Sequence, residues 1–427
     1  MPSSSGETEA VVVAKRLDST VVNKTFEYSK LLPGTKVLVT TCLASGEAGG
    51  GGAVTMATVA RLLAAGCRLR VLIHSGDSAY DAGNGGEGTV EMLEGSVASK
   101  ADCEKAVEGQ DVVVHTVSCS SGVGVGVVEG TRNLLGAAAA AGVKSLVFAG
   151  SASVVFGGED LKASSEDVPY PKRHVDSLSA AIAEAEQEVL RANGDVSAAS
   201  GNMITCSVRA AAVYGPGERE CLVPGLVSRA RSGRFACPAF VGNGNNVVDF
   251  VYAGNVAHAI VLAAQRLLAL SSASSDATAA GSSGRAYFVT DDEPVPFGDF
   301  ASRVLSGLGY PAQSAGMPRL LAVVLAFFLR VLAVVLSPFL NFRPTLTARH
   351  IAEGGRTQCF EISRARKELG YAPLWTQKEG LDITLQALRS LRNPRAKVKH
   401  VGPFTLEDVA PHSSEDDAWI IVDGKVR

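Results

Sequence analysis

The chain has no surplus of basic residues. Its 427 residues include 40 Lys and Arg against 43 Asp and Glu, which gives a formal net charge of −3. A protein that binds the nucleic-acid backbone needs a concentrated basic surface to neutralise the phosphates. We therefore expect no nucleic-acid partner.

The sequence also lacks the cysteine patterns of zinc sites and redox motifs. Its Cys residues stand at positions 42, 67, 103, 119, 206, 221, 237 and 359. No two of them form Cys-x-x-Cys, and no His lies close enough to complete a zinc quartet. We interpret them as reduced, mostly buried thiols and expect no metal site.

The first residues lack the features of a secretory signal. Residues 1–16 (MPSSSGETEAVVVAKR) contain acidic groups and only a short apolar patch, whereas a signal peptide needs a basic start and a longer apolar run. We interpret residues 1–34 as a flexible leader and expect a protein that faces the cytosol.

What the sequence does contain is a repeated alternation of strand and helix patterns. With 46% hydrophobic residues, the chain can bury a large core. The expected strands are Lys36–Thr41, Leu69–Ile73, Asp111–His115 and Ser145–Ala149, and the expected helices are Val54–Ala65, Ala101–Val107 and Glu129–Ala141. This alternation predicts a Rossmann-type α/β fold, a doubly wound parallel sheet that binds ligands at its carboxyl edge.

A glycine-rich segment follows the first expected strand. Dinucleotide binding needs glycines there, so that the backbone and a helix N-terminus can approach the pyrophosphate. Counting back from the end of the first helix places the three expected glycine positions at Gly49, Gly52 and Thr55. Ile73 and His74 end the second strand, where an Asp would bind a ribose hydroxyl or an Arg a phosphate. Both a cofactor loop and a flexible insertion remain open, and neither NAD nor NADP is favoured.

Residues 320–336 form an apolar run that only Arg330 interrupts. As a helix this run would reach about 25 Å, against a hydrocarbon core of about 30 Å. Arg330 would cost about 2.5–3.5 kcal/mol at the bilayer centre. We therefore expect a membrane-associating segment at 320–340 that lies in the interface, where a sterol could enter from lipid. The alternative is a core helix.

A series of motifs occurs in fixed order between about residues 36 and 392. They are VVEGTRNLL at 127–135, SASVVFGGEDL at 151–161, VPYPKRH at 168–174, VYGPGE at 213–218, VGNGNNVVDFVYAGNVAHA at 241–259, AYFVTDDEPV at 286–295 and ARKELGYAP at 365–373. This ordered set resembles the 3β-hydroxysteroid dehydrogenase and sterol-4α-carboxylate 3-dehydrogenase branch of the extended short-chain dehydrogenases. The resemblance implies a dehydrogenase domain over residues 35–392, with a smaller C-terminal substrate region.

The same resemblance implies an activity and a set of contacts. In that family NAD or NADP accepts a hydride from a sterol 3β-hydroxyl, and in the 4α-carboxylate branch carbon dioxide is then lost. Ser151 matches the family's Ser that hydrogen-bonds the reacting oxygen. The implied cofactor-binding positions are Gly49, Gly50, Gly52, Thr116, Ala210 and Val213.

Two positions depart from the family at the centre of its chemistry. The family's Tyr and Lys fall on Leu178 and Ile182. A Lys four residues after a Tyr shares its helix face, lowers the pKa of the phenol and lets the phenol move a proton. Leu and Ile cannot do this, and no Tyr in the chain precedes a Lys by four residues. Tyr170 and His174 have the spacing, but Pro171 interrupts a helix there.

The end of the chain carries a second resemblance. Residues 404–427 are similar to the opening of a cytochrome b5 haem domain, and that family's haem-ligating His residues lie further downstream. We expect a linker and an incomplete cytochrome b5-like segment over residues 393–427, and no haem binding in this chain.

The leading hypothesis is a sterol dehydrogenase relative whose chemistry is impaired. Its expected partners are a sterol-like small molecule and the cytosolic face of the endoplasmic reticulum membrane, with a sterol-demethylation complex or a homodimer as the assembly. The alternative is a non-catalytic nucleotide-binding or scaffold subunit of a membrane lipid or redox complex. An epimerase or reductase acting on nucleotide sugars or flavonoids is less favoured, because soluble substrates need no apolar segment.

Overall fold

The computed structural model describes residues 33–42, 52–73, 90–117, 125–194, 203–218, 222–231, 242, 244–272, 284–310, 318–336, 351 and 355–392, and four strands of two residues each after residue 412. The chain divides into a unit of residues Met1–Ala387 and a unit of residues Leu388–Arg427. The predicted leader up to residue 32 and the positions Gly49 and Gly50 lie outside the described residues. The domain boundaries expected at residues 35 and 392 stay a prediction.

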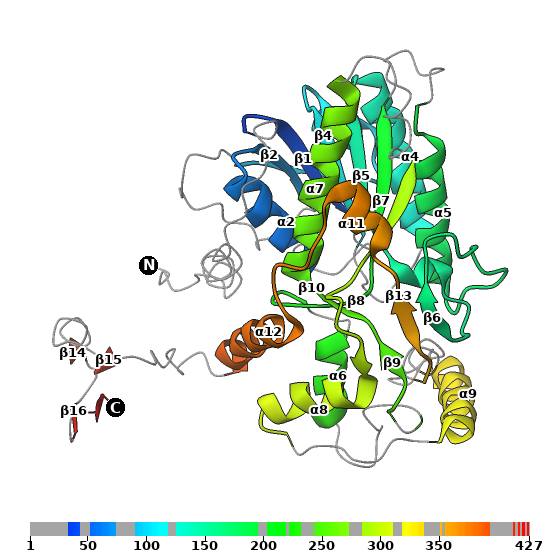
Figure 1. Ribbon diagram of the computed structural model, residues 1–427, viewed down its shortest axis with the longest axis vertical. Helices are drawn as coiled ribbons and strands as arrows, with labels where there is room; N and C mark the ends of the chain where they lie inside the picture. Colours follow the sequence, from blue (N-terminus) through cyan, green and yellow to red (C-terminus); the bar gives the residue numbers. More distant parts are fainter. Residues whose placement is uncertain are drawn as a thin grey trace. The chain divides into compact units, whose positions relative to one another are not determined.

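A seven-stranded sheet forms the centre of the first unit (Figure 1). Its strands are β1 (Lys36–Cys42), β2 (Arg68–Ile73), β3 (Val90–Glu94), β4 (Val112–Val117), β5 (Ser145–Ser151), β7 (Ile204–Ala210) and β11 (Arg285–Val289). The order is β11-β7-β5-β4-β1-β2-β3, and each neighbouring pair is parallel. The chain runs outward from β1 to β3 and returns to β4 on the other side of β1. The predicted Rossmann-type sheet is therefore confirmed, with its switch point between β1 and β4.

The strands are apolar because both faces of the sheet are covered. β4 is a run of largely β-branched residues that is buried up to Thr116, and β1 and β5 bury residues 37–40 and 145–149, as in parallel sheets flanked by helices. The strands β3, β7 and β11 were not among those expected from the sequence pattern. Glu91 and Glu94 interrupt the apolar residues of β3, which an edge strand tolerates.

Two groups of helices cover the sheet (Figure 1). α2 (Ala53–Ala64) packs against α7 (Ala253–Ser272), whereas α4 (Val125–Ala140) packs against both α3 (Lys100–Val107) and α5 (Ser177–Arg191). Within the described chain, α7 is the helix long and apolar enough to cross a membrane, but 78% of its apolar window is buried inside the protein. Its apolar character therefore serves the core.

A smaller region lies beyond the carboxyl ends of the strands (Figure 1). It contains a sheet of β6 (Leu161–Ser164), β9 (Val247–Val248), β12 (Val295–Pro296) and β13 (Gln358–Phe360), and a parallel pair of β8 (Ala212–Tyr214) and β10 (Phe250–Tyr252). Its helices are α6 (Leu222–Arg231), α8 (Phe297–Gly307) and α9 (Arg319–Leu336); α11 (Ser363–Leu369) and α12 (Gln377–Arg392) follow in the chain. Segments far apart in the sequence therefore build this region together.

Beyond the end of α12, the second unit is described only as two short hairpins. β14 (Ser413–Ser414) pairs with β15 (Asp417–Ala418), and β16 (Ile421–Val422) pairs with β17 (Lys425–Val426). The remainder of the cytochrome b5-like segment lies outside the described residues, so that resemblance stays a prediction.

Candidate functional site

The N-terminus of α2 lies at the carboxyl edge of the sheet, beside β1. Gly52 immediately precedes the helix, and its carbonyl accepts the first helical hydrogen bond from the amide of Met56 at 3.2 Å. The first turn holds no acidic residue. Its amides have no partner within the helix, and the helix dipole favours a negative charge there. This end of the site therefore suits a phosphate.

Thr55, at the third glycine position, binds α2 to β4 by a hydrogen bond. The hydroxyl of Thr116 donates to the carbonyl of Thr40 at 3.0 Å, so it accepts from the Thr55 hydroxyl at 2.7 Å. Both threonines are buried. A polar contact here takes the place of the close packing that a glycine would allow, and the Thr116 hydroxyl is used within the fold.

His115 links β1, β4 and α4 beneath this edge. The Thr131 hydroxyl donates to the carbonyl of Val127 at 2.7 Å, so it accepts from Nε2 of His115 at 3.1 Å. Nδ1 of His115 then accepts from the Thr40 hydroxyl at 2.7 Å. Burial lowers the pKa of His115 to about 4. His115 is therefore neutral near pH 7 and has a structural role.

Ser151 ends β5 in register with Ala210, which ends β7. The Oγ atom of Ser151 accepts a hydrogen bond from the backbone amide of Ser153 at 3.2 Å, at the start of the turn η1 (Ala152–Val155). Its own hydroxyl hydrogen thus remains available for donation. Gly52, Thr116, Ser151 and Ala210 share the carboxyl edge, and Val213 lies on β8. Their roles as cofactor or substrate contacts stay predictions.

Leu178 and Ile182 lie in the first two turns of α5. The Asp176 carboxylate caps this helix by accepting from the amide of Ser179 at 2.6 Å. Ile182 is buried in the main core, and Leu178 is half-buried and packs against the same core. The two positions where the sequence predicts the family's Tyr and Lys therefore hold packed apolar side chains.

Tyr170 and His174 are engaged elsewhere. The Tyr170 hydroxyl donates to Glu186 at 2.6 Å, and burial together with the Glu186 charge raises the pKa of this phenol well above its usual range. Nε2 of His174 donates to the carbonyl of Val154 at 3.0 Å. This pair does not reproduce a Tyr whose pKa is lowered by a neighbouring ammonium.

A buried ion pair, not predicted from the sequence, fastens α5 to β7. Glu186 is fully buried and accepts from Nη2 of Arg209 at 2.7 Å and from Nε at 3.0 Å. Ser207 and Tyr170 donate to the same carboxylate, each at 2.6 Å. The signal in the sequence was an acidic residue, Glu186, four residues after Ile182 and so on the same face of the helix, together with Arg209 in a strand pattern.

This fold, with a glycine before the first helix and a serine at the end of β5, defines a Rossmann-type protein of the short-chain dehydrogenase class. The solved structure of gox2253 resembles it with a TM-score of 0.62 at 22% identity, covering 84% of this chain and 99% of that one. The dTDP-glucose 4,6-dehydratase DesIV from Streptomyces venezuelae, solved with NAD and TYD bound, gives 0.59 at 19% identity over 84% and 98%. At these identities the likeness concerns the fold.

Residues 48–319 match the model of the 3-beta hydroxysteroid dehydrogenase/isomerase family, and the chain belongs to this family. It is 34% identical over 323 residues to 3beta-hydroxysteroid-dehydrogenase/decarboxylase isoform 2 of Arabidopsis thaliana, covering 74% of this chain and 55% of that protein's length. It is also 34% identical over 352 residues to the human sterol-4-alpha-carboxylate 3-dehydrogenase, decarboxylating, covering 81% and 88%. The predicted family is thereby confirmed.

Proposed function

We propose that this chain binds NAD or NADP and a sterol-like 3β-alcohol, and that it oxidises the alcohol far more slowly than its active relatives. The substrate class follows from the relatives, whose names describe sterol and hydroxysteroid dehydrogenases. The slow rate follows from one observation, the packing of Leu178 and Ile182 where a Tyr and a Lys would move the proton. Sterol C4 decarboxylation is the proposed pathway step.

The residues present fit part of the cofactor. Gly52 and the first turn of α2 would hold the pyrophosphate, because unpaired amides and the helix dipole meet there. The bound nicotinamide would accept the hydride. Ser151 would donate its free hydroxyl hydrogen to the sterol oxygen. Ile182 offers no hydrogen bond to the nicotinamide ribose, and Ile73 at the end of β2 offers none to the other ribose, so we propose no preference between NAD and NADP.

The second candidate is a non-catalytic nucleotide-binding or scaffold subunit of a membrane lipid or redox complex. The same observation favours it, because a site without a proton carrier can still bind a nucleotide. The two functions differ only in turnover.

Binding and turnover measured on one preparation separate these functions. We expect calorimetric titration with NADH and NADPH to show binding, and an assay with a 3β-hydroxysterol to give turnover about 10²–10⁴ below that of an active relative. The control variant is Gly52→Val. The backbone of Gly52 (φ −55°, ψ 173°) lies in a region that any residue adopts. The added side chain should therefore block the pyrophosphate without straining the backbone at this position. Binding without turnover selects the scaffold, and turnover near the rate of an active relative contradicts the proposal.

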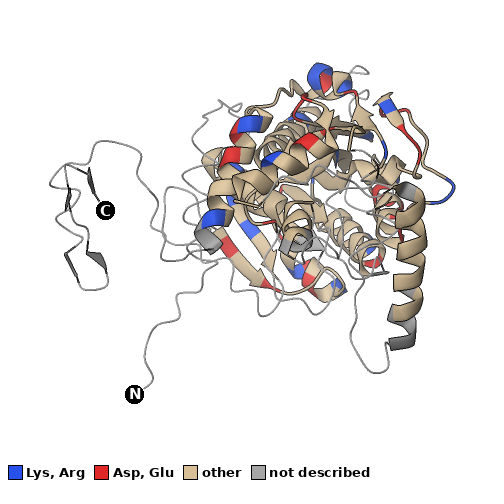
Figure 2. Cartoon of the chain, turned by 90° about the horizontal axis from the view of Figure 1, so that it is seen from below, with Lys and Arg blue, Asp and Glu red and all other residues tan. Residues whose placement is uncertain are grey.

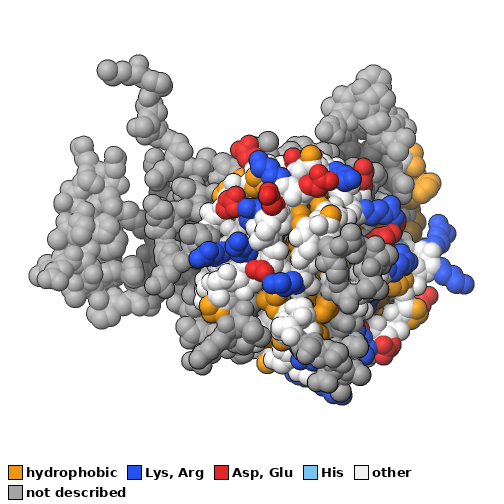
Figure 3. Space-filling model, turned by 90° about the horizontal axis from the view of Figure 1, so that it is seen from above, with side chains coloured by type: hydrophobic (Ala, Val, Ile, Leu, Met, Phe, Trp, Pro, Cys, Tyr) orange, Lys and Arg blue, Asp and Glu red, His pale blue; other side chains and the backbone are white. Residues whose placement is uncertain are grey.

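Helix α9 supports a membrane partner. Its exposed large apolar residues are Leu320, Leu321, Val323, Val324, Phe327, Phe328, Val331 and Leu332. The opposite side of the helix packs Ala322, Leu325 and Leu329 against Ile351. A contiguous apolar face of this size is unusual on a monomer. The charged residues of α9 are Arg319 and Arg330, and the helix between them carries no charged residue in Figure 2, whereas both signs are interspersed on the face in Figure 3. We propose that α9 lies in the cytosolic interface of the endoplasmic reticulum membrane.

Vesicle binding tests this membrane contact. Phe327→Asp with Phe328→Asp should lower partitioning onto phosphatidylcholine vesicles by at least about tenfold, because each buried Phe contributes on the order of 1.5–3 kcal/mol. Gly136→Asp with Ala140→Asp adds the same charge to exposed positions of α4 and should leave partitioning unchanged. Equal partitioning of both variants contradicts the proposal. A dimer in size-exclusion chromatography that only the Phe variant dissociates would instead assign the face to a homodimer.

A further inference from the structure

Asp291 joins four segments of the chain just after β11. One oxygen, Oδ1, accepts from the amide of Tyr252 at 2.9 Å and from the side-chain amide of Asn255 at 2.7 Å. The other oxygen, Oδ2, lies 2.8 Å from the hydroxyl of Tyr214. Asn255 also binds the backbone of Trp375, both as donor at 2.8 Å and as acceptor at 3.0 Å. The C-terminal segment is therefore held to β8, β10 and α7 around this carboxyl group.

The hydroxyl of Tyr214 faces two acceptors but has one hydrogen. Besides Oδ2 of Asp291, it contacts the backbone carbonyl of Gln377, the first residue of α12, at 3.1 Å. If Asp291 is ionised, one of these two contacts is a pair of oxygens without a hydrogen, which is costly in a buried site. If Asp291 carries a proton on Oδ2, it donates to Tyr214, and Tyr214 donates to Gln377. Both contacts are then hydrogen bonds.

We propose that Asp291 is a proton switch for the anchoring of the C-terminal segment. Protonated, it leaves the hydroxyl hydrogen of Tyr214 for the carbonyl of Gln377. When the proton passes to solvent, the carboxylate takes that hydrogen for itself and the Gln377 carbonyl is released.

The surroundings place this titration close to neutrality. Asp291 is 3% exposed, and burial raises its pKa to about 6 against the lowering effect of its three hydrogen-bonded neighbours. The titratable groups that interact with Asp291 are Tyr214, Tyr252, Tyr371 and Glu293. The nearby cations Arg366 and Arg303 bind Asp292 and the side chain of Gln377 instead. The charge of Glu293 raises the pKa of Asp291 further. Among the described residues no Lys, Arg or His forms an ion pair with Asp291 that would hold it ionised.

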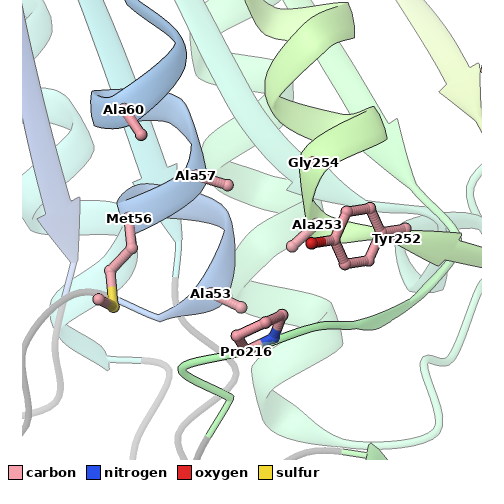
Figure 4. Close-up of a pocket in the computed structure, with 8 residues that line it drawn as sticks. All are labelled: Ala53, Met56, Ala57, Ala60, Pro216, Tyr252, Ala253 and Gly254. Carbon is pink, nitrogen blue, oxygen red and sulfur yellow. The ribbon is translucent and has the colours of Figure 1, made fainter. Parts of the chain in front are cut away.

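Close packing connects the residues around Asp291 to α2, the helix that we propose holds the pyrophosphate of the cofactor. Tyr214 is followed by Gly215 and Gly217, where an added Cβ would lie 2.8 Å from Ala253 and 2.9 Å from Met56. Met56 stands in the first turn of α2, and Figure 4 shows it with Pro216 and Tyr252 around one small pocket between α2 and α7. The Tyr252 hydroxyl points toward α2 and has no hydrogen-bond partner among the described residues. A shift at Tyr214 would therefore act on the N-terminus of α2 through this packing.

Trp375 reports on this switch, because its backbone binds Asn255 and its ring contacts Tyr252. Replacing the other tryptophan, as Trp419→Phe, leaves Trp375 as the sole source of tryptophan emission. We expect its fluorescence to change with a midpoint near pH 6. In Asp291→Asn the amide nitrogen donates to Tyr214 permanently and mimics the protonated acid, so the change should disappear.

Asp249→Asn is the matched control, because burial raises the pKa of Asp249 to about 6 as well. The Oδ2 atom of Asp249 accepts a hydrogen bond from the amide of Phe360 at 2.8 Å instead of contacting Tyr214. This variant should keep the transition. Carbon-13 NMR of the carboxyl groups should show the Asp291 signal titrating near pH 6. The proposal is overturned if the transition is missing in the parent, persists in Asp291→Asn or vanishes in Asp249→Asn, or if the Asp291 carboxyl is already ionised at about pH 5.

Discussion

Substituting Leu178→Tyr together with Ile182→Lys should raise the rate of sterol oxidation by about 10²–10⁴, which corresponds to roughly 3–5 kcal/mol of barrier. The two positions lie one helix turn apart on α5, so the ammonium and the phenol would share a face and the phenol would gain a lowered pKa. The measurement is turnover of a 3β-hydroxysterol with NAD and with NADP.

The controls separate chemistry from packing. Leu178→Phe with Ile182→Met keeps apolar volume without a proton carrier and should not raise the rate. Because Ile182 is only 3% exposed, Ile182→Lys alone should lower stability, so the fold of each variant is checked by circular dichroism. A folded double variant that stays as slow as the parent would show that some other feature limits the reaction.

Substituting Glu186→Gln should lower the free energy of unfolding by about 3–5 kcal/mol, because it leaves the buried Arg209 charge without its carboxylate. Urea denaturation measures the change. Glu184→Gln on the same helix removes an exposed partner of Arg132, and it should cost less than about 1 kcal/mol.

A double variant distinguishes a lost ion pair from a lost shape. Glu186→Leu with Arg209→Met removes both charges, and it should recover much of the stability lost in Glu186→Gln. If the single and double variants unfold at the same urea concentration, the ion pair does not fasten α5 to β7.

Four strands of the main sheet, β1, β2, β4 and β5, could be predicted because their signals are local. The run KVLVTT predicted β1, and the apolar spacing of the next segment predicted a helix over Val54–Ala65, which the structure has at Ala53–Ala64. The smaller sheet could not be predicted. β9 and β12 have two residues each, and so short a strand has no periodicity of its own. Their existence depends on partners distant in the sequence.

The residues of the candidate site also differ in whether their signal is local in the sequence or depends on distant partners. Gly52 was expected from a glycine-rich turn, and Ser151 from the resemblance of the motif SASVVFGGEDL to the family; each signal is contiguous in the sequence. The partners of Glu186 are a Tyr sixteen residues earlier and an Arg 23 residues later, and nothing local selects them. The bonds of Asn255 to Asp291 and Trp375 likewise join residues far apart in the sequence.

The pairing of β6 with β13 has a consequence for synthesis of the protein. The amide of Leu161 donates to the carbonyl of Thr357, and the neighbouring bond from Thr357 to Asp160 spans 197 residues. A ribosome must therefore translate most of the chain while the edge of β6 has no partner. Unpaired strand edges on a growing polypeptide attract other chains. We expect this stretch to be the part of the nascent protein that most needs a chaperone.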